Sequence, residues 1–297
     1  MNSPTHIDKN QVIKSFNRAA PTYEQWSKLQ KMVDDSLLER LEWLKLEPQH
    51  ILDVGGGIGR LSRTLSQQYQ NAEVYSIDIS TTMVQVAHQK AFNEIHQPHF
   101  ICADGAQLPF ADNSIDLLMS NLMLQWCNDI QTIFAEFARV LKPDGALFFS
   151  TFGPETLIEL RHSFAQVDDA IHLNHFLDMH DIGDTLLQVG LTNPVMDVDW
   201  FQFIYNDVKQ LMFELKQIGA HNMTVGRPRG LMGKDKFRAM LTAYEQYRLP
   251  DDSIPATYEI VYGHARGRKN TELQTPHTVT IPISQLKKTM ESRDQSS

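Results

Sequence analysis

Ile51-Leu-Asp-Val-Gly-Gly-Gly-Ile-Gly59 is the stretch of sequence that organises the rest of the chain. Apolar residues flank Asp53 and four glycines follow within five positions, which is typical of a buried strand running into a tight turn. Leu61 and Leu65 come next at helical spacing, so we expect the turn to lead into a helix. Glycine adopts positive φ without strain and lets the backbone approach a ligand closely. Alone, this pattern fits either a dinucleotide site or a simple tight turn between a strand and a helix.

Acidic residues close the next two strands that we expect. Residues 72–78 read as a strand ending in Asp78, and an acid in this place commonly accepts hydrogen bonds from ribose hydroxyls. Residues 100–103 read as a shorter strand closed by Asp104, whose carboxylate is suited to the exocyclic amine of an adenine. Both acids therefore indicate a nucleotide-like ligand at the ends of the strands.

Strands and helices continue to alternate as far as residue 151. A strand over 115–120 is followed by a loop that begins at Asn121, and a helix over 130–141 leads through the turn 142–145 into a strand over 146–151. Such alternation implies right-handed crossovers, a parallel sheet and a ligand crevice at the carboxyl ends of the strands. The sequence therefore predicts an α/β fold.

The composition limits the class of protein. The chain has 297 residues, 42% of them apolar, which is enough for one large domain or a domain with a cap. It has no apolar run of ~18 to 20 residues to cross a bilayer, and residues 1–10 carry no signal pattern. Two cysteines, Cys102 and Cys127, favour a cytoplasmic location and read as inert core thiols. The net charge of −9 argues against a general nucleic-acid binder.

The N-terminal residues have a helical pattern from 11 to 44, which Pro21 interrupts. We therefore expect two helices joined near this proline. Tyr23 and Trp26 follow the break, and two interpretations remain open for them. Either they pack against the core, or they belong to a lid whose aromatic side chains close over a bound cofactor.

The alternation becomes less regular beyond residue 152. We expect a strand over 197–205, helices over 208–218 and 237–247, and a final strand over 255–264.

Three histidines with nearby acids, His172, His175 and His180, raise the question of a metal site. His172 and His175 would share a helix face, but His180 would point away from His175 on the same helix. No His-x-x-x-His pair supports a tetrahedral site. We therefore expect helix-capping and surface histidines, and no metal.

At this point the chain resembles the class I S-adenosylmethionine-dependent methyltransferases, over residues 48–152. The resemblance rests on the glycine turn, the two strand-end acids, and the segments Leu108-Pro-Phe110 and Arg139-Val-Leu-Lys-Pro-Asp-Gly145. It implies a Rossmann-like fold with a mostly parallel seven-stranded sheet, an N-terminal helical lid and helical cap insertions. The residues that it implies for binding S-adenosylmethionine, with S-adenosylhomocysteine as product, are Asp53, Gly55, Gly57, Asp78, Ile79, Asp104, Gly105, Ala106 and Asn121.

Four segments of the second half are more specific. With them, the chain resembles the malonyl-acyl-carrier-protein O-methyltransferases of biotin synthesis, from about Phe16 to Gly267. This implies methyl transfer to the free carboxylate of a malonyl thioester, which disguises it for the enzymes of fatty-acid elongation. The segments are Ser150-Thr-Phe-Gly-Pro-Glu-Thr-Leu-Ile-Glu-Leu-Arg161, Asp178-Met-His-Asp-Ile-Gly-Asp184, Leu215-Lys-Gln-Ile-Gly-Ala-His-Asn222 and Ala256-Thr-Tyr-Glu-Ile-Val-Tyr-Gly-His264.

Two alternatives remain open at this stage. The first is a methyltransferase that acts on another small acceptor, since the fold alone does not determine the function. The second is a cofactor-binding assembly factor that grips a protein partner, because the mitochondrial complex I assembly factors share parts of the second-half pattern. Malonyl-coenzyme A is an alternative to the carrier protein as substrate.

The chemistry that the resemblance implies needs no general base, because a malonyl carboxylate with a pKa of roughly 4 is ionised at neutral pH. The enzyme must instead align the carboxylate with the methyl group and exclude water. Arg161 is the first candidate to hold the carboxylate, His180 and His221 are the next, and Tyr23 is a candidate wall. Each has a structural alternative: the arginine bridging surface acids, the histidines capping helices.

Acyl carrier proteins are acidic, so we expect a basic docking surface. Arg227, Arg229, Lys234, Lys236 and Arg238 lie within twelve residues and are the candidates, although a solvated loop and helix face is the simpler interpretation. The expected organisation is a lid over 1–45, a cofactor-binding core over 46–152, a cap with the last strands over 153–267, and a disordered tail over 268–297.

Overall fold

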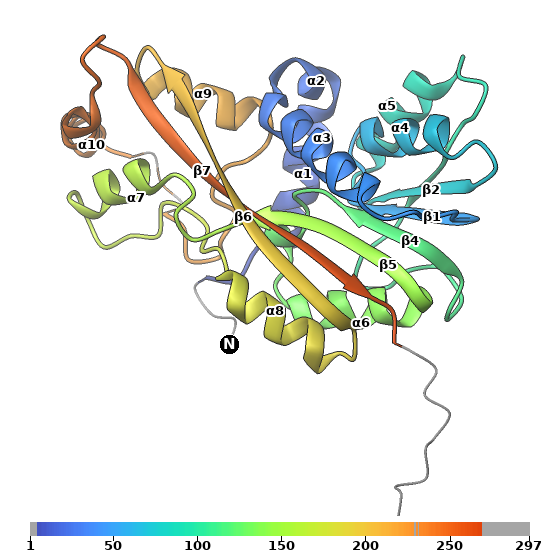
Figure 1. The fold of residues 1–297 in the computed structure, drawn as a ribbon. Coiled ribbons are helices and arrows are strands. Elements are labelled where there is room, and N and C mark those ends of the chain that lie inside the picture. Colours follow the sequence, from blue (N-terminus) through green and yellow to red (C-terminus); the bar gives the residue numbers. More distant parts are fainter. Residues whose placement is uncertain (1–4, 229, 231, 269–297) are drawn as a thin grey trace, which may run out of the picture.

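The computed structural model describes residues 5–228, 230 and 232–268. Its strands are β1 (His50–Val54), β2 (Glu73–Asp78), β3 (His99–Cys102), β4 (Ile115–Ser120), β5 (Leu141–Phe152), β6 (Thr192–Tyr205) and β7 (Ile254–Arg266). They form one seven-stranded sheet in the order β3-β2-β1-β4-β5-β7-β6 (Figure 1). Strands β1 to β5 pair in parallel, and β7 is antiparallel to both β5 and β6. The predicted α/β fold with a mostly parallel sheet is confirmed.

Helices cover both faces of the sheet, because side chains that alternate along each strand point to opposite sides. Ile51 of β1 packs toward helices α3 (Lys28–Glu42) and α4 (Arg60–Gln68), while its neighbour Leu52 packs toward α6 (Ile130–Val140) and α8 (Met179–Gln188). Helix α5 (Thr81–Ala91) follows β2. This two-sided burial explains why β1, β4 and β5 read as nearly continuous apolar runs.

The N-terminal segment forms α1 (Lys9–Ala19), the short 3-10 helix η1 (Ala20–Thr22) and α2 (Tyr23–Trp26) ahead of α3. Asp8 caps α1 by accepting a hydrogen bond from the backbone N–H of Gln11. The predicted break at Pro21 is confirmed, since this residue stands in η1.

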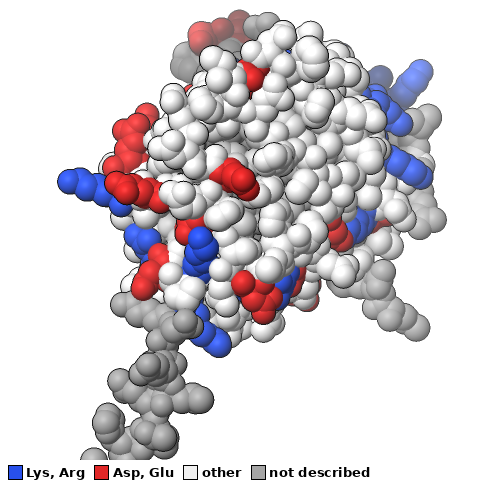
Figure 2. Space-filling view, turned by 90° about the vertical axis from the view of Figure 1, so that its right-hand side faces the viewer, with Lys and Arg blue, Asp and Glu red and all other residues white. Residues whose placement is uncertain are grey.

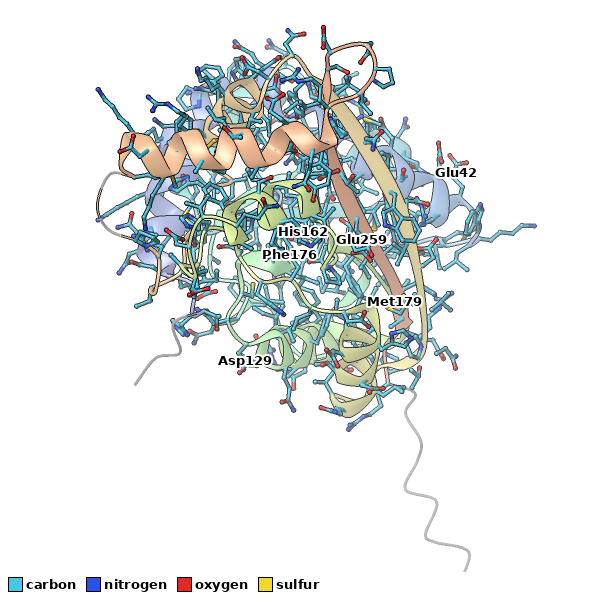
Figure 3. The ribbon with its side chains drawn as sticks, turned by 90° about the vertical axis from the view of Figure 1, so that its left-hand side faces the viewer. Glu42, Asp129, His162, Phe176, Met179 and Glu259 are labelled. Atoms are coloured by element: carbon cyan, nitrogen blue, oxygen red, sulfur yellow. The ribbon has the colours of Figure 1, made fainter. Side chains whose placement is uncertain are left out.

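The second half contributes α7 (Ile158–Ala165), α9 (Val208–Gln217), α10 (Lys234–Tyr244) and the 3-10 helix η3 (Glu245–Tyr247), besides α8. Figure 3 looks onto this side of the molecule, where α10 crosses the top and α8 lies below; His162 on α7 and Glu259 on β7 are labelled. The buried carboxylate of Glu159 accepts hydrogen bonds from the N–H (3.1 Å) and hydroxyl (2.5 Å) of Thr257, and so fixes α7 to β7.

Five expectations need correction. Residues 142–145 interrupt the register between β4 and β5, but they lie within β5 as a bulge instead of preceding it. Strand β6 begins at Thr192, and α10 begins at Lys234, each earlier than predicted. His172 and His175 lie in a loop, not on a helix. Cys102 is exposed, not a core thiol.

The predicted tail lies outside the described residues, apart from residue 268. In the described part of the chain, no helix is long and apolar enough to cross a membrane.

Candidate active site

The carboxyl ends of β1, β2 and β4 surround a cavity of about 280 Å³, here called the cofactor crevice. Helix α1 and Tyr23 form one wall of this crevice. The α1 residues that line it are Lys9, Val12 and Phe16. Eight of the nine residues implied for the cofactor line the crevice, and Asp53 lies next to it. The eight are Gly55, Gly57, Asp78, Ile79, Asp104, Gly105, Ala106 and Asn121.

The glycine turn brings bare backbone to the crevice. Gly55 and Gly57 adopt φ of +80° and +54°. A Cβ on Gly55 would lie 2.4 Å from the Cγ of Met123, whereas a Cβ on Gly57 would meet nothing within 4 Å. Gly57 therefore faces open space, and Gly55 is needed for the close packing of the turn.

Asp78 presents a buried carboxylate to the crevice. Its Oδ2 accepts a hydrogen bond from the N–H of Gly57 (3.0 Å), and its Oδ1 accepts one from the N–H of Ser80 (2.7 Å). Each oxygen keeps a further lone pair for a ligand hydroxyl. Burial raises the pKa of Asp78 to about 6, because desolvation outweighs these two bonds.

Asp104 lies at the other end of the crevice. Its Oδ1 accepts a hydrogen bond from the N–H of Ala106 (3.1 Å), and its Oδ2 pairs with the ammonium of Lys9 on α1. The N-terminal helix is thus bound to the residue that the resemblance assigns to the adenine.

Asn121 and Asp53 support the crevice from below. The side-chain amide of Asn121 donates to the backbone oxygen of Gln30 (3.0 Å) and to Asp34 (2.6 Å), and its oxygen accepts from Ser150 (2.6 Å). Asp53 is buried beneath the glycine turn and accepts a hydrogen bond from the hydroxyl of Ser62 (2.5 Å). Desolvation raises the pKa of Asp34 to about 6 and that of Asp53 to about 7.

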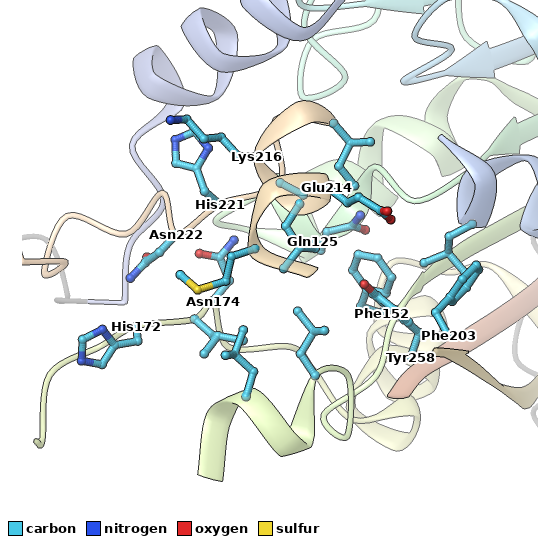
Figure 4. A pocket seen from close by; sticks show the side chains of 18 of the residues that line it. Gln125, Phe152, His172, Asn174, Phe203, Glu214, Lys216, His221, Asn222 and Tyr258 are labelled. Carbon is cyan, nitrogen blue, oxygen red and sulfur yellow. The ribbon is translucent and has the colours of Figure 1, made fainter. Parts of the chain in front are cut away.

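A second cavity of about 310 Å³, here called the acceptor cavity, is shown in Figure 4. Its walls come from α3, α7, β6, β7, α9 and the loops around residues 172–176 and 220–222, and are mainly apolar and aromatic. The two cavities share six lining residues, Gln30, Gln125, Trp126, Phe152, Ile218 and Ala220. A group bound in the crevice would therefore meet a second ligand at this common wall.

The four residues predicted for catalysis occupy different places. Tyr23 lines the cofactor crevice, and burial raises the pKa of its hydroxyl. His221 lines the acceptor cavity (Figure 4); burial, and then the charges of Arg227 and nearby residues, lower its pKa, so the ring is neutral at neutral pH.

Arg161 lies behind the wall of the acceptor cavity, where it donates to the backbone oxygen of Asn174 (3.1 Å). Its Nε is buried and has no hydrogen-bond partner among the described residues. His180, in contrast, lies in the solvent-facing first turn of α8, where Asp178 is the cap and accepts a hydrogen bond from the N–H of His180 (2.8 Å). The side chain of His180 is 78% exposed and contacts Asp178 (2.6 Å). It lines neither cavity.

Among the described residues, no group of three His, Cys, Asp or Glu side chains is arranged to hold a metal ion. His172 instead contacts Asp168 (2.6 Å) and stacks on the ring of Phe164, with centroids 4.1 Å apart.

The face around α4 and α5 carries acidic and basic side chains interspersed over a largely uncharged surface (Figure 2).

Sequence reasoning missed Gln30 and Lys9. Both come from N-terminal helices that fold back over the crevice, and no local motif marks them.

The fold and the crevice together define the class I S-adenosylmethionine-dependent methyltransferases. Residues 52–149 match the family model of a methyltransferase domain. YcgJ of Bacillus subtilis is similar in fold, with a TM-score of 0.55 and 17% identity, over 79% of this chain and 99% of that one. A phosphoethanolamine N-methyltransferase of Haemonchus contortus, solved with S-adenosylhomocysteine, is also similar in fold, with a TM-score of 0.50 and 18% identity. The match covers 79% of this chain and 53% of that one.

Curated relatives narrow the class to a family. Malonyl-[acyl-carrier protein] O-methyltransferase of Gallionella capsiferriformans is 48% identical, over 87% of this chain and 91% of its own length. The protein of that name from Halorhodospira halophila is 41% identical, over 93% of this chain and 94% of its own length. The chain belongs to the malonyl-[acyl-carrier protein] O-methyltransferase family.

Proposed function

We propose that this protein transfers a methyl group from S-adenosylmethionine to the free carboxylate of a malonyl thioester on acyl carrier protein, an early step of biotin synthesis. The observation that carries the proposal is the common wall of the cofactor crevice and the acceptor cavity, in a chain of this family. A cytoplasmic location, expected from the two free cysteines, is part of the proposal.

The residues of the crevice fit the cofactor. When bound, S-adenosylmethionine supplies a methyl group on a positively charged sulfur. Gly57 leaves open space beside the backbone for the methionine end, Asp78 offers unused lone pairs to the ribose hydroxyls, and Asp104 and Ala106 bound the adenine end. Residues 1–45 act in this proposal as the lid, with α1 and Tyr23 over the crevice.

The acceptor side needs alignment and exclusion of water, not a base. A malonyl carboxylate is already ionised at neutral pH, because its pKa is roughly 4. Trp126, Phe152 and Ile218 are the large apolar residues of the common wall. In this proposal they exclude water from the place where the methyl group is transferred.

Arg161 is proposed to attract the carboxylate from behind the cavity wall, and the neutral ring of His221 to hydrogen-bond with the acyl arm. His180, which is exposed and paired with Asp178, is assigned no role in this proposal.

The carrier protein is proposed to dock beside α10, at the basic surface formed by Arg227, Lys234, Lys236 and Arg238. The loop between Arg227 and α10 adds Met232 to the wall of the acceptor cavity, so this surface adjoins the cavity. Lys236 pairs with Asp168 (2.6 Å) and Arg238 with Asp235 (3.6 Å), and an acidic partner would compete for both cations. Arg229 of the predicted surface lies outside the described residues.

The proposal is tested with S-adenosylmethionine labelled in its methyl group and purified malonyl carrier protein. A carboxyl methyl ester is hydrolysed by mild alkali, so the label should reach the carrier and then leave it as volatile methanol. Because alkali also cleaves the thioester, label that is non-volatile after alkali, whether released as an acid or still on the carrier, would place the methyl group on carbon or nitrogen and contradict carboxyl methylation.

A further inference from the structure

Gln30 lies where three cavities meet. Its side chain lines the cofactor crevice, the acceptor cavity, and a small cavity of about 60 Å³ between the glycine turn and Arg60. The residue stands in the first turn of α3, and the hydrogen bond from Asn121 to its backbone oxygen (3.0 Å) holds that turn over the end of β4. The backbone of Gln30 is therefore fixed by the core of the fold at the point where its side chain reaches all three cavities.

The amide oxygen Oε1 of Gln30 is buried and has no hydrogen-bond partner in the described part of the chain. A buried polar atom without a partner is unfavourable, so most such atoms serve a ligand or a water molecule. Among the six residues of the common wall, only Gln30 and Gln125 carry a side-chain oxygen. Gln125 is already engaged: its amide donates to the backbone oxygen of Leu122 (2.6 Å), and its oxygen accepts from Thr151 (3.3 Å).

We propose that the amide oxygen of Gln30 recognises the positively charged sulfonium group of S-adenosylmethionine and so distinguishes this substrate from its neutral product, S-adenosylhomocysteine. The inference rests on the proposed function. The methyl group must leave the crevice at the wall that the two cavities share, and Gln30 supplies the unengaged oxygen of that wall. A partly negative oxygen there stabilises the sulfonium ion and has much less to stabilise once the sulfur is neutral.

The neutrality of the amide also suits an anionic acceptor. A carboxylate at position 30 would attract the sulfonium ion more strongly, but it would repel the malonyl carboxylate that has to approach the same wall. An amide dipole attracts the cation with little cost to the anion. Gln30 is thereby a specificity-determining residue for both ligands.

The test compares equilibrium binding of S-adenosylmethionine and S-adenosylhomocysteine to the full chain by titration calorimetry, without acceptor. Gln30→Leu should weaken binding of the sulfonium ligand by about tenfold and change binding of the neutral product by less than about twofold. Gln30→Glu should shift the ratio of the two affinities in the opposite direction and raise the KM for malonyl carrier protein. Gln25→Leu, at an exposed glutamine of α2, is the matched control and should change none of these values.

Equal losses for both ligands in Gln30→Leu would overturn the inference. So would an unchanged affinity ratio with a higher KM for the carrier, which would make Gln30 a donor to the acceptor carboxylate. These results can be told apart from failure of the proposed function, which would appear as a wild-type protein that binds the cofactor but does not methylate the carboxylate of the malonyl carrier.

Discussion

Gly55 and Gly57 share a positive φ but differ in their surroundings, so alanine should have different effects at the two positions. Gly57→Ala costs backbone strain of about 1 kcal/mol and adds a methyl group in open space at the crevice. It should weaken cofactor binding with little loss of thermal stability. Gly55→Ala adds a clash with Met123 and should lower the melting temperature clearly more. Calorimetric unfolding and cofactor titration of both variants check the pair; equal melting temperatures would contradict it.

The carboxylate of Asp78 makes cofactor binding dependent on pH. Its pKa of about 6 in the free protein lies above the ordinary 3.8, so it takes up a proton as the pH falls through about 6. Ribose hydroxyls donate hydrogen bonds best to the ionised carboxylate. The affinity for the cofactor is therefore highest above pH 6 and falls as the pH drops below the pKa of Asp78. Asp34 and Asp53, on the far side of the glycine turn, titrate nearby, with pKa values of about 6 and 7.

Binding of S-adenosylmethionine should therefore be about tenfold weaker at pH 5 than at pH 7. In Asp78→Asn, affinity at pH 7 should fall, and the dependence on pH should shrink to the part contributed by Asp34 and Asp53. Titration calorimetry at several pH values measures both effects. If Asp78→Asn kept the full pH dependence of the wild-type protein, titration of Asp78 would not be its cause.

The sequence places Asp78, Asp104 and the glycines at strand ends, and the structure brings them together at the crevice because the carboxyl ends of neighbouring parallel strands meet at one edge of the sheet. The residues that it misses, Gln30 and Lys9, reach the site only through tertiary packing of α1 and α3. His180 was chosen from a motif, and the motif turns out to cap a helix at the surface. A local pattern thus locates a strand-end residue but not one that arrives from a distant helix.

At the scale of elements, α1 is held to the core by the apolar packing of Val12 and Phe16 and by polar contacts around the crevice. Besides the pair of Lys9 and Asp104, the side-chain oxygen of Asn17 accepts hydrogen bonds from the hydroxyl of Ser80 (2.7 Å) and the N–H of Thr82 (3.3 Å). Asp78 lies two residues before Ser80, so we expect opening of α1 to be coupled to release of the ligand.

Asn17→Ala should accelerate release of S-adenosylhomocysteine several-fold, because α1 then opens at lower cost, about 1 kcal/mol per lost hydrogen bond. Stopped-flow displacement measures the release rate. Lys14→Ala, at an exposed position of the same helix, is the control and should leave it unchanged. An unaltered rate in Asn17→Ala would show that α1 does not limit release.

The parallel units from β1 to β5 were predictable because the central strands β1, β4 and β5 are buried on both faces and an acid stands at or just after the end of β2 and of β3. The bulge in β5 and the long β6 were not, because both depend on pairing with strands that are distant in sequence. In β6, half-buried and exposed residues alternate along its first half, so the strand lacks the apolar run that marks the central strands.

At the scale of the whole molecule, the net charge of −9 repels an acidic carrier protein from most of the surface. A local basic surface would therefore direct the carrier to one place. Reversing Arg227 and Arg229 to glutamate should raise the KM for malonyl carrier protein about tenfold and reduce its dependence on salt, with cofactor affinity unchanged. Lys45→Glu, at an exposed position after α3, is the control. Loss of cofactor binding in the double variant would contradict the proposal that these arginines bind the carrier protein.

The central claim is methylation of the free malonyl carboxylate, and the intact mass of the carrier protein tests it most directly. Malonyl carrier protein and acetyl carrier protein are incubated with the purified protein and S-adenosylmethionine, and each carrier is weighed by mass spectrometry. The account predicts a gain of one methyl group on the malonyl form and none on the acetyl form, which lacks the free carboxylate. A gain on both forms, or no gain on the malonyl form while the cofactor is bound, would contradict it.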